Sequence, residues 1–289
     1  DYPEEFKCLY MKECSESGRN ALKEKRVITS YLAGKNNGAV ILSEDEGTSV
    51  LLNGEDHVRI QVLCNGMDIQ SCFKKANEID DYIDAHFDYA FDEKYGYKTT
   101  FPTNTGTGMK AGYTLHLPSL SDARRLNDIS AELGRFGLKF RTVYGDGQNG
   151  YGNLYQISTQ KTLGQDEREV IKDLDDIVLQ IVNQEKEQRE HFYKKDKIQM
   201  DDEIYKSYGV LKYARKLSLK DSMVLISELM TGISLGVLQF AHNGRYNINE
   251  LIMDIQPAVL RQNSGKAMSV AETDVLRAEY IRKYLPEII

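Results

Sequence analysis

Residues 53–61 read Asn-Gly-Glu-Asp-His-Val-Arg-Ile-Gln, and this stretch says the most about the fold. An alternation of period two is typical of a β-strand with one polar and one buried face. The polar face would carry Glu55, His57, Arg59 and Gln61, opposite Val58, Ile60 and Val62. A carboxylate beside a guanidinium suits a site that holds a cation next to a polyphosphate. On spacing alone, an ordinary ion pair on a half-exposed strand is the better explanation.

Strands and helices alternate on both sides of this stretch. The predicted strands are 38–42, 48–52, 110–117, 138–144 and 153–159, and the predicted helices are 68–91 and 121–136. Gly137 stands where a C-cap glycine belongs. Glycine-rich loops at 103–108 and 145–150 favour antiparallel pairing of the strands that they join. We therefore expect an α+β fold with a largely antiparallel sheet flanked by helices.

From residue 166 onward the pattern is helical. A long amphipathic helix and a charged stretch at 183–197 lead into three or four shorter helices. Two helix starts carry capping sequences, Ser218 with Asp221 and Ser269 with Glu272. Pro257 is expected to end or kink the helix before it. The expected domains are an α+β domain over 1–195 and a helical domain over 200–289.

The composition limits the classes of function. The chain has 289 residues, 41% of them hydrophobic and 28% charged, with a net charge of −7. This acidic balance argues against nonspecific nucleic-acid binding, which needs a dense Lys/Arg surface. No apolar run approaches the length of a membrane span, so we expect a soluble protein. The opening residues 1–5 are neither a signal peptide nor an initiator start, which suggests that the numbering begins inside a longer protein.

Four cysteines are present, Cys8, Cys14, Cys64 and Cys72. They form no Cys-x-x-Cys pair and have no histidine at metal-ligand spacing, so no protein-held metal is predicted. We expect free thiols, with Cys72 packed on the apolar face of its helix.

Two further predicted strands also carry a cationic side chain on a polar face. One begins at Lys110, and the next carries Arg141 and ends near Asp146. Arg59, Lys110 and Arg141 would each point a cation from a different strand toward one polar surface. Three converging cations suit a triphosphate, because phosphoryl transfer is catalysed mainly by positioning and charge neutralisation. Separately solvated strand charges are the alternative.

The loop at 102–108 and two histidines remain open to two interpretations. The loop lacks the Lys-Ser/Thr ending of a Walker A motif, so it is no P-loop. Its glycines could let backbone N–H groups approach a phosphate, or could simply form a hairpin turn. His57 and His116 are candidate acid–base groups, although a lone histidine on a strand is more often a structural hydrogen-bonding residue.

Three runs together resemble the phosphagen kinase family, the ATP:guanidino phosphotransferases: residues 53–61, 97–118 and 141–164. Within the family the resemblance is closest to the bacterial protein-arginine kinase branch, whose extra C-terminal domain is similar to the helical tail here. The resemblance covers nearly the whole chain. It implies the family's catalytic domain, with the N-terminal lobe largely missing from these residues, followed by the helical domain.

The resemblance also implies a reaction and a site. The ATP γ-phosphoryl group, with Mg²⁺ on the phosphates, would move to a guanidinium nitrogen of an arginine in a protein. Glu55 and Asp146 would be the catalytic carboxylates that grip the guanidinium and accept a proton. The implied nucleotide-binding residues are Arg59, Lys110, Arg141 and His57, and the implied substrate-binding residues are Glu55, Asp146, Phe101 and Asn104.

Several positions depart from the family pattern. Asp146 replaces a Glu and is about 1.5 Å shorter, which costs about 10²-fold in rate unless the loop compensates. Phe101 replaces a Cys beside the guanidinium, and Lys110 replaces an Arg, which loses the bidentate fork. The family's Ser-Arg-Ile-Arg nucleotide-binding run does not occur in these residues. The phosphoarginine-binding Arg-Asp-x-x-Arg-Ala of the branch reads Thr-Asp-Val-Leu-Arg-Ala at 273–278.

The sequence therefore predicts a protein-arginine kinase or a close relative, with an activity that the substituted positions reduce or abolish. The alternative is a catalytically weak or inactive relative that binds nucleotide or arginine-bearing proteins as a scaffold. A kinase of small guanidino compounds is disfavoured by the helical extension. The resemblance further implies a cytoplasmic role in protein quality control, with a Clp-type unfoldase, a zinc-binding activator and homodimerisation. Neither nucleic acid nor a membrane is an expected partner.

Overall fold

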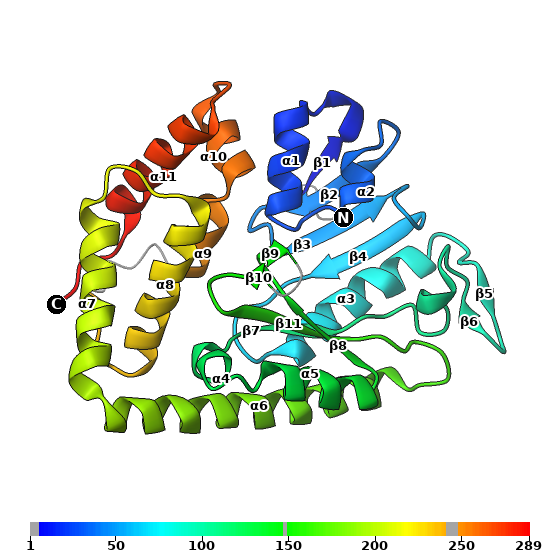
Figure 1. The fold of residues 1–289 in the computed structure, drawn as a ribbon. Coiled ribbons are helices and arrows are strands. Elements are labelled where there is room, and N and C mark those ends of the chain that lie inside the picture. Colours follow the sequence, from blue (N-terminus) through cyan, green and yellow to red (C-terminus); the bar gives the residue numbers. More distant parts are fainter. Residues whose placement is uncertain (1–5, 147–148, 241–247) are drawn as a thin grey trace. The chain divides into compact units, whose positions relative to one another are not determined.

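The computed structural model describes residues 6–146, 149–240 and 248–289, with the backbone alone for residues 146 and 149. The chain divides into two compact units. Unit 1 comprises residues 1–113 and 158–177, and unit 2 comprises residues 114–157 and 178–289. The fold is α+β, as the sequence predicted, and is built from antiparallel strand pairs and helices (Figure 1).

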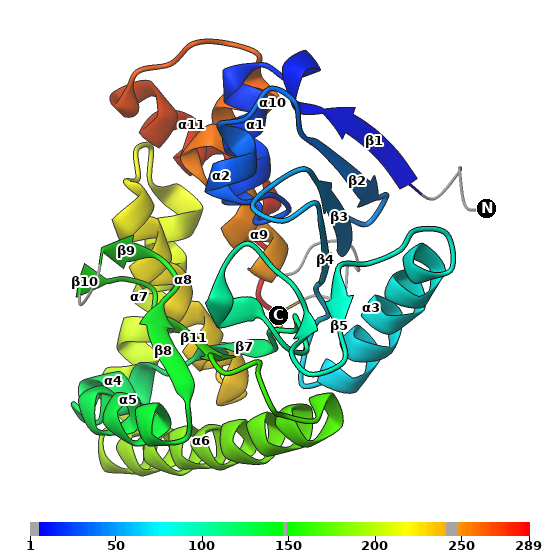
Figure 2. The same ribbon diagram turned by 90° about the vertical axis from the view of Figure 1, so that its right-hand side faces the viewer.

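Unit 1 is built on a four-stranded sheet with the order β1-β2-β3-β4, antiparallel throughout. Its strands are β1 (Phe6–Tyr10), β2 (Ala39–Ser43), β3 (Thr48–Leu52) and β4 (Val58–Val62), and its helices are α1 (Glu16–Glu24), α2 (Ser30–Ala33) and α3 (Ile69–Asp84). Figures 1 and 2 show α1 and α2 on one side of this sheet and α3 on the other. The fully buried Leu32 of α2 packs with Val40 and Leu51, which pair with each other on β2 and β3.

The strand predicted over 53–61 is shorter than expected. β4 begins at Val58, and the residues before it form the turn from β3, closed by a 2.8 Å hydrogen bond from the Asn53 N–H to the His57 carbonyl. Asn53 takes a left-handed conformation (φ 58°) next to Gly54, which makes Asn-Gly a turn signal here. The prediction was therefore wrong for Glu55 and His57, which lie in the turn, whereas Arg59 lies on the strand with its side chain exposed.

The helix predicted over 68–91 also ends early, at Asp84. Its last turns carry Asp80, Asp81 and Asp84 but no basic residue, and acidic groups are unfavourable at the negative end of the helix dipole. The chain then turns back, and the Tyr89 hydroxyl donates to Asp80 Oδ1 at 3.0 Å. A short hairpin follows, β5 (Phe91–Asp92) and β6 (Gly96–Tyr97).

A second sheet has the order β7-β11-β8, with β7 (Gly112–His116), β11 (Leu154–Thr159) and β8 (Leu138–Thr142). The Leu117 N–H bonds the Asn153 carbonyl and the Thr159 N–H bonds the Ala111 carbonyl, so β7 and β11 run antiparallel. The predicted loop 145–150 contains a small hairpin, β9 (Gly145–Asp146) and β10 (Asn149–Gly150). The helix predicted over 121–136 is two helices, α4 (Pro118–Asp122) and α5 (Leu126–Arg135), because the chain turns at Arg124 with φ 59°.

The named elements after β11 are all helices: α6 (Glu167–Lys195), α7 (Lys197–Tyr213), α8 (Leu219–Ser234), α9 (Ile248–Asp254), α10 (Pro257–Ser264) and α11 (Val270–Tyr284). α6 continues through the charged stretch, where ion pairs four residues apart support it, as in Glu190–Lys194. Five described helices follow α6, where three or four were expected. The described residues contain no helix long and apolar enough for a membrane span.

Candidate active site

The Glu55 carboxylate is held at one of its two oxygens. Glu55 is half-buried in the β3–β4 turn of unit 1, and the Thr29 hydroxyl donates to its Oε2 at 3.0 Å. The other oxygen, Oε1, makes no hydrogen bond within the described residues. An ionised carboxylate can accept about four hydrogen bonds. Most of the acceptor capacity of Glu55 is therefore open to a donor from outside the chain.

The backbone of this turn is fixed by two other residues. Lys35 Nζ donates to the carbonyl of Gly54 at 3.2 Å. The Thr100 hydroxyl donates to the Glu55 carbonyl at 2.7 Å, and the Thr100 N–H donates to Asp56 Oδ1, also at 2.7 Å. Thr100 thereby ties the turn to the segment that contains Phe101 and Asn104.

That neighbouring segment holds one unmet acceptor. The Phe101 ring is 50% exposed, while the Phe101 carbonyl accepts from the Asn104 N–H at 2.8 Å. Asn104 Oδ1 is buried, and no described group donates to it. A buried acceptor without a partner is costly, so a donor supplied by a ligand would be favourable here.

The glycine loop is packed against a distant part of unit 1. A side chain at Gly106, where φ is +114°, would meet the Thr162 carbonyl oxygen at 2.2 Å. The Thr162 hydroxyl donates to the Thr105 carbonyl at 2.7 Å. This close approach explains the glycine, and it fixes the course of the loop that leads to Lys110.

The predicted site residues fall in both units. Unit 1 contains Glu55, His57, Arg59, Phe101, Asn104 and Lys110. His57, Arg59 and Lys110 have exposed side chains, and Lys110 precedes β7 instead of lying on it. Unit 2 contains Arg141 and Asp146. The backbone of Asp146 pairs with Asn149, and the Asp146 side chain lies outside the described part of the structure.

Arg141 lies on β8 with an exposed side chain. Its Nε donates at 2.8 Å to Oε1 of Gln156 on the adjacent strand β11, and a second guanidinium nitrogen donates to the same oxygen. Gln156 thus orients the guanidinium. Sequence reasoning missed Gln156, Thr29 and Thr100 because each acts through a contact with a residue far away in the chain. The only signal was that Thr29 precedes a short helix as an N-cap.

His116 is a structural residue. Its Nε2 lies 2.8 Å from the Ser227 hydroxyl, which also accepts from Asn153 Nδ2 at 3.1 Å. Burial, with a smaller contribution from the Arg189 charge, lowers the pKa of His116 to about 3. The imidazole is therefore neutral at neutral pH and engaged with α8, so the acid–base interpretation of His116 is not supported.

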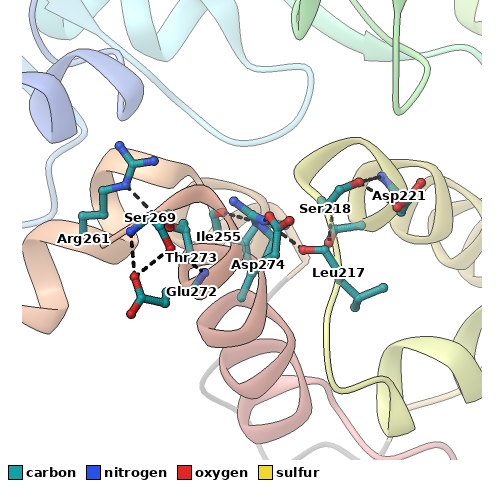
Figure 3. Close-up of polar contacts among 11 residues, drawn as sticks. Leu217, Ser218, Asp221, Ile255, Arg261, Ser269, Glu272, Thr273 and Asp274 are labelled. Carbon is teal, nitrogen blue, oxygen red and sulfur yellow. Dashed lines mark hydrogen bonds and ion pairs between the residues drawn. The ribbon is translucent and has the colours of Figure 1, made fainter. Parts of the chain in front are cut away.

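Residues 273–278 of the helical part use their polar groups internally (Figure 3). Arg277, 1% exposed, donates to the carbonyls of Ile255 (3.0 Å) and Leu217 (2.9 Å) and to Asp274 Oδ1 (2.6 Å). Thr273, in place of the family's first arginine, is also buried, and Arg261 Nε donates to its hydroxyl at 3.2 Å. Arg277 is thus a packing and hydrogen-bonding residue of the domain core.

Two protein-family models match this chain. The model described as "ATP:guanido phosphotransferase, C-terminal catalytic domain" matches residues 1–188, and "Protein-arginine kinase McsB C-terminal domain" matches residues 197–288. The chain is 40% identical over 280 residues to a protein-arginine kinase of Bacillus pumilus, covering 97% of this chain and 77% of that protein. For a protein-arginine kinase of Bacillus mycoides, the identity is 40% over 281 residues, with 97% and 79% covered.

Solved structures share the fold. A lombricine kinase superposes with a TM-score of 0.53 at 20% identity, covering 63% of this chain and 54% of that one. A duplicated taurocyamine kinase from Schistosoma mansoni, with bound transition-state analogue components, gives 0.55 at 24% identity, covering 62% and 26%.

Proposed function

This chain belongs to the ATP:guanido phosphotransferase family, and we propose that it is a kinase of arginine side chains in proteins. The reaction forms a bond between a guanidinium nitrogen and the γ-phosphorus of ATP and breaks the bond from that phosphorus to the bridging oxygen, releasing ADP. The proton leaves the attacking nitrogen for a carboxylate. Support comes from the protein-arginine kinases that match 97% of the chain.

A carboxylate is essential to this chemistry because arginine stays protonated at all ordinary pH values. Glu55 is proposed as the residue that orients the guanidinium and accepts its proton, with Asp146 as the second carboxylate. Aligning the reacting nitrogen, with proton transfer in the transition state, is the main contribution that side chains can make to such a step.

One observation carries the assignment of Glu55. Its Oε1 is open to a donor, while its turn is bonded through Thr100 to the segment that holds the unmet acceptor Asn104 Oδ1. A guanidinium presents five N–H donors in a planar fork, which suits two separate acceptors. Asn104 and the adjacent Phe101 are accordingly proposed as substrate-binding residues.

Cations are proposed to bind ATP. Arg59 and Lys110 of unit 1, and Arg141 of unit 2, have exposed side chains suited to phosphate oxygens, and the exposed His57 is assigned to the nucleotide with them. Mg²⁺ is proposed as the ion that neutralises the phosphate charge when it is bound. Lys110 supplies charge without the bidentate geometry of an arginine.

Finer assignments are also proposals. Residues 1–195 would act as the catalytic module and residues 200–289 as the helical module of a cytoplasmic enzyme of protein quality control. A Clp-type unfoldase, a zinc-binding activator and a second copy of the chain are its proposed partners. They follow from the protein-arginine kinase resemblance alone.

The test is transfer of labelled γ-phosphate from MgATP to an arginine-rich protein such as casein. We expect an acid-labile, base-stable product, because an N-linked phosphoryl group is lost in acid. Glu55→Gln should abolish the transfer, while Glu44→Gln, at an exposed carboxylate of the same unit, should leave it unchanged. ATP binding without transfer above the Glu55→Gln level would instead support the scaffold alternative.

A further inference from the structure

We infer that Thr29 is a positioning residue for the Glu55 carboxylate, an inference that rests on the proposed function. The Thr29 hydroxyl has one hydrogen, and it is directed at Glu55 Oε2 at 3.0 Å. The hydroxyl oxygen of Thr29 itself accepts the Leu32 N–H at 3.1 Å, which makes Thr29 the N-cap of α2. One hydroxyl thus caps a helix and holds one edge of the carboxylate.

Thr29 is well placed for this role because its backbone cannot shift easily. The preceding residues Val27 and Ile28 are 2% and 3% exposed, and Leu32 after it is fully buried. Leu51, on the strand that leads into the Glu55 turn, belongs to the same core cluster. Donor and acceptor are therefore anchored on one packed core, which is the condition for precise orientation of a reacting group.

The contact also decides which carboxylate edge can meet the substrate. Thr29 fills one of the two acceptor positions of Oε2, whereas Oε1 has no donor among the described residues, so the guanidinium is expected mainly at Oε1. A carboxylate without this bond would rotate about its last torsion, which is broad for a Glu side chain. Loss of the Thr29 hydroxyl should therefore lower the fraction of Glu55 in the reactive orientation.

Three substitutions separate orientation from helix capping. Thr29→Val has a similar shape but neither donates nor caps, Thr29→Asp keeps a capping oxygen but cannot donate to Glu55, and Thr29→Ser keeps both functions. Ser15, the side-chain N-cap of α1, offers a matched control, since Ser15→Ala removes a cap elsewhere in unit 1.

Steady-state kinetics on the full chain, with MgATP and an arginine-rich protein, give the readout. We expect kcat to fall about tenfold to 10²-fold in both Thr29→Val and Thr29→Asp, with the KM for ATP unchanged. Thr29→Ser should stay within a few-fold of wild type. Thermal unfolding should show a lower midpoint for Thr29→Val and Ser15→Ala, which both lose a helix cap.

The outcomes are separable. Wild-type kcat in both Thr29→Val and Thr29→Asp overturns the positioning role while leaving the proposed function intact. So does a loss of activity that tracks the unfolding midpoint and appears equally in Ser15→Ala. If the wild-type chain transfers no phosphate at all, the proposed function has failed instead.

Discussion

One oxygen of the Glu55 carboxylate accepts a hydrogen bond from its own chain, and the other has no donor among the described residues. Thr29 occupies Oε2, and Thr100 ties the Glu55 backbone to the Phe101–Asn104 segment. An arginine substrate would replace solvent around Oε1 and supply the donor that Asn104 Oδ1 lacks. At this scale, we propose that the guanidinium is recognised through acceptors that have no donor among the described residues.

A first prediction concerns the second carboxylate. Asp146→Glu adds the methylene that the family pattern has, so we expect kcat for arginine phosphorylation to rise, by up to about 10²-fold. Asp146→Ala should lower it, and Asp146→Asn should resemble the alanine variant. Initial-rate measurements at saturating MgATP compare the kcat of these variants with that of the wild type. A rate for Asp146→Glu at or below wild type would mean that the shorter side chain is already accommodated.

At the residue scale, the sequence indicated which residues are suited to the chemistry, but not which residues contact one another. Glu55, Arg59 and Arg141 were singled out from local spacing and resemblance, and the last two do lie on strands with exposed side chains. Thr29 and Thr100 could not be found in this way. Their partners lie 26 and 45 positions away in the chain, and no local pattern encodes such a contact.

At the scale of elements, β7 and α8 are joined by the His116–Ser227 hydrogen bond inside unit 2. The folded state keeps His116 neutral down to about pH 3, whereas the imidazole of the unfolded chain takes up a proton below about pH 6.5. The unfolded state thus binds more protons between these values. The free energy of unfolding must therefore decrease as the pH falls below about 6.5.

The second prediction follows from this linkage. His116 should contribute a slope of about 1.4 kcal/mol per pH unit between pH 6 and pH 4. Urea unfolding of His116→Gln should show a flatter pH dependence than wild type over this range. His191→Gln, at an exposed histidine, serves as the control. Equal slopes in His116→Gln and wild type would show that the imidazole is protonated in the folded protein.

The third prediction concerns Arg277 on α11, which bonds Ile255 and Leu217 on other segments of the helical part. Arg277→Ala should reduce the free energy of unfolding by about 3–5 kcal/mol, because it leaves buried carbonyls and the Asp274 carboxylate without their donor. Arg215→Ala, at an exposed position, should change it by less than about 0.5 kcal/mol. Urea unfolding measures both. A small loss for Arg277→Ala would mean that water replaces the guanidinium.

Element boundaries show where local signals succeed. Ser218 and Ser269 cap their helices as predicted, Ser269 in a full capping box with Glu272. The helix before Pro257 ends at Asp254, also as predicted, and Pro257 itself begins α10. These signals act within one helical turn. The predicted start of β4 and the predicted end of α3 were wrong. In both cases the prediction extended the hydrophobic periodicity too far, through the Asn53-Gly54 turn and through a run of aspartates.

At the scale of the whole molecule, strand residues and helices share one core inside unit 2. The cluster around α7 and α8 includes the buried Leu154 of β11, with Tyr151 packed against it. The helical residues therefore complete their core with residues from the middle of the chain. The sequence could not reveal this, since the helical pattern after the charged stretch at 183–197 led us to expect a separate domain over 200–289.

The fourth prediction tests that shared core. Leu154→Ala should reduce the free energy of unfolding by about 2–5 kcal/mol and lower amide hydrogen-exchange protection in α7 and α8. Leu163→Ala, at a side chain that is 55% exposed, is the matched control. Unchanged protection of α7 and α8 in Leu154→Ala would indicate that the helices fold without β11.

The central claim is that this chain joins the γ-phosphorus of ATP to an arginine nitrogen with Glu55 as the essential carboxylate. Phosphorus-31 NMR of the full chain with MgATP and an arginine-rich protein observes that bond directly. We predict a phosphoramidate resonance that grows as ADP forms, and none above background with Glu55→Gln. A phosphate ester signal, or an undiminished phosphoramidate signal from Glu55→Gln, would contradict the claim.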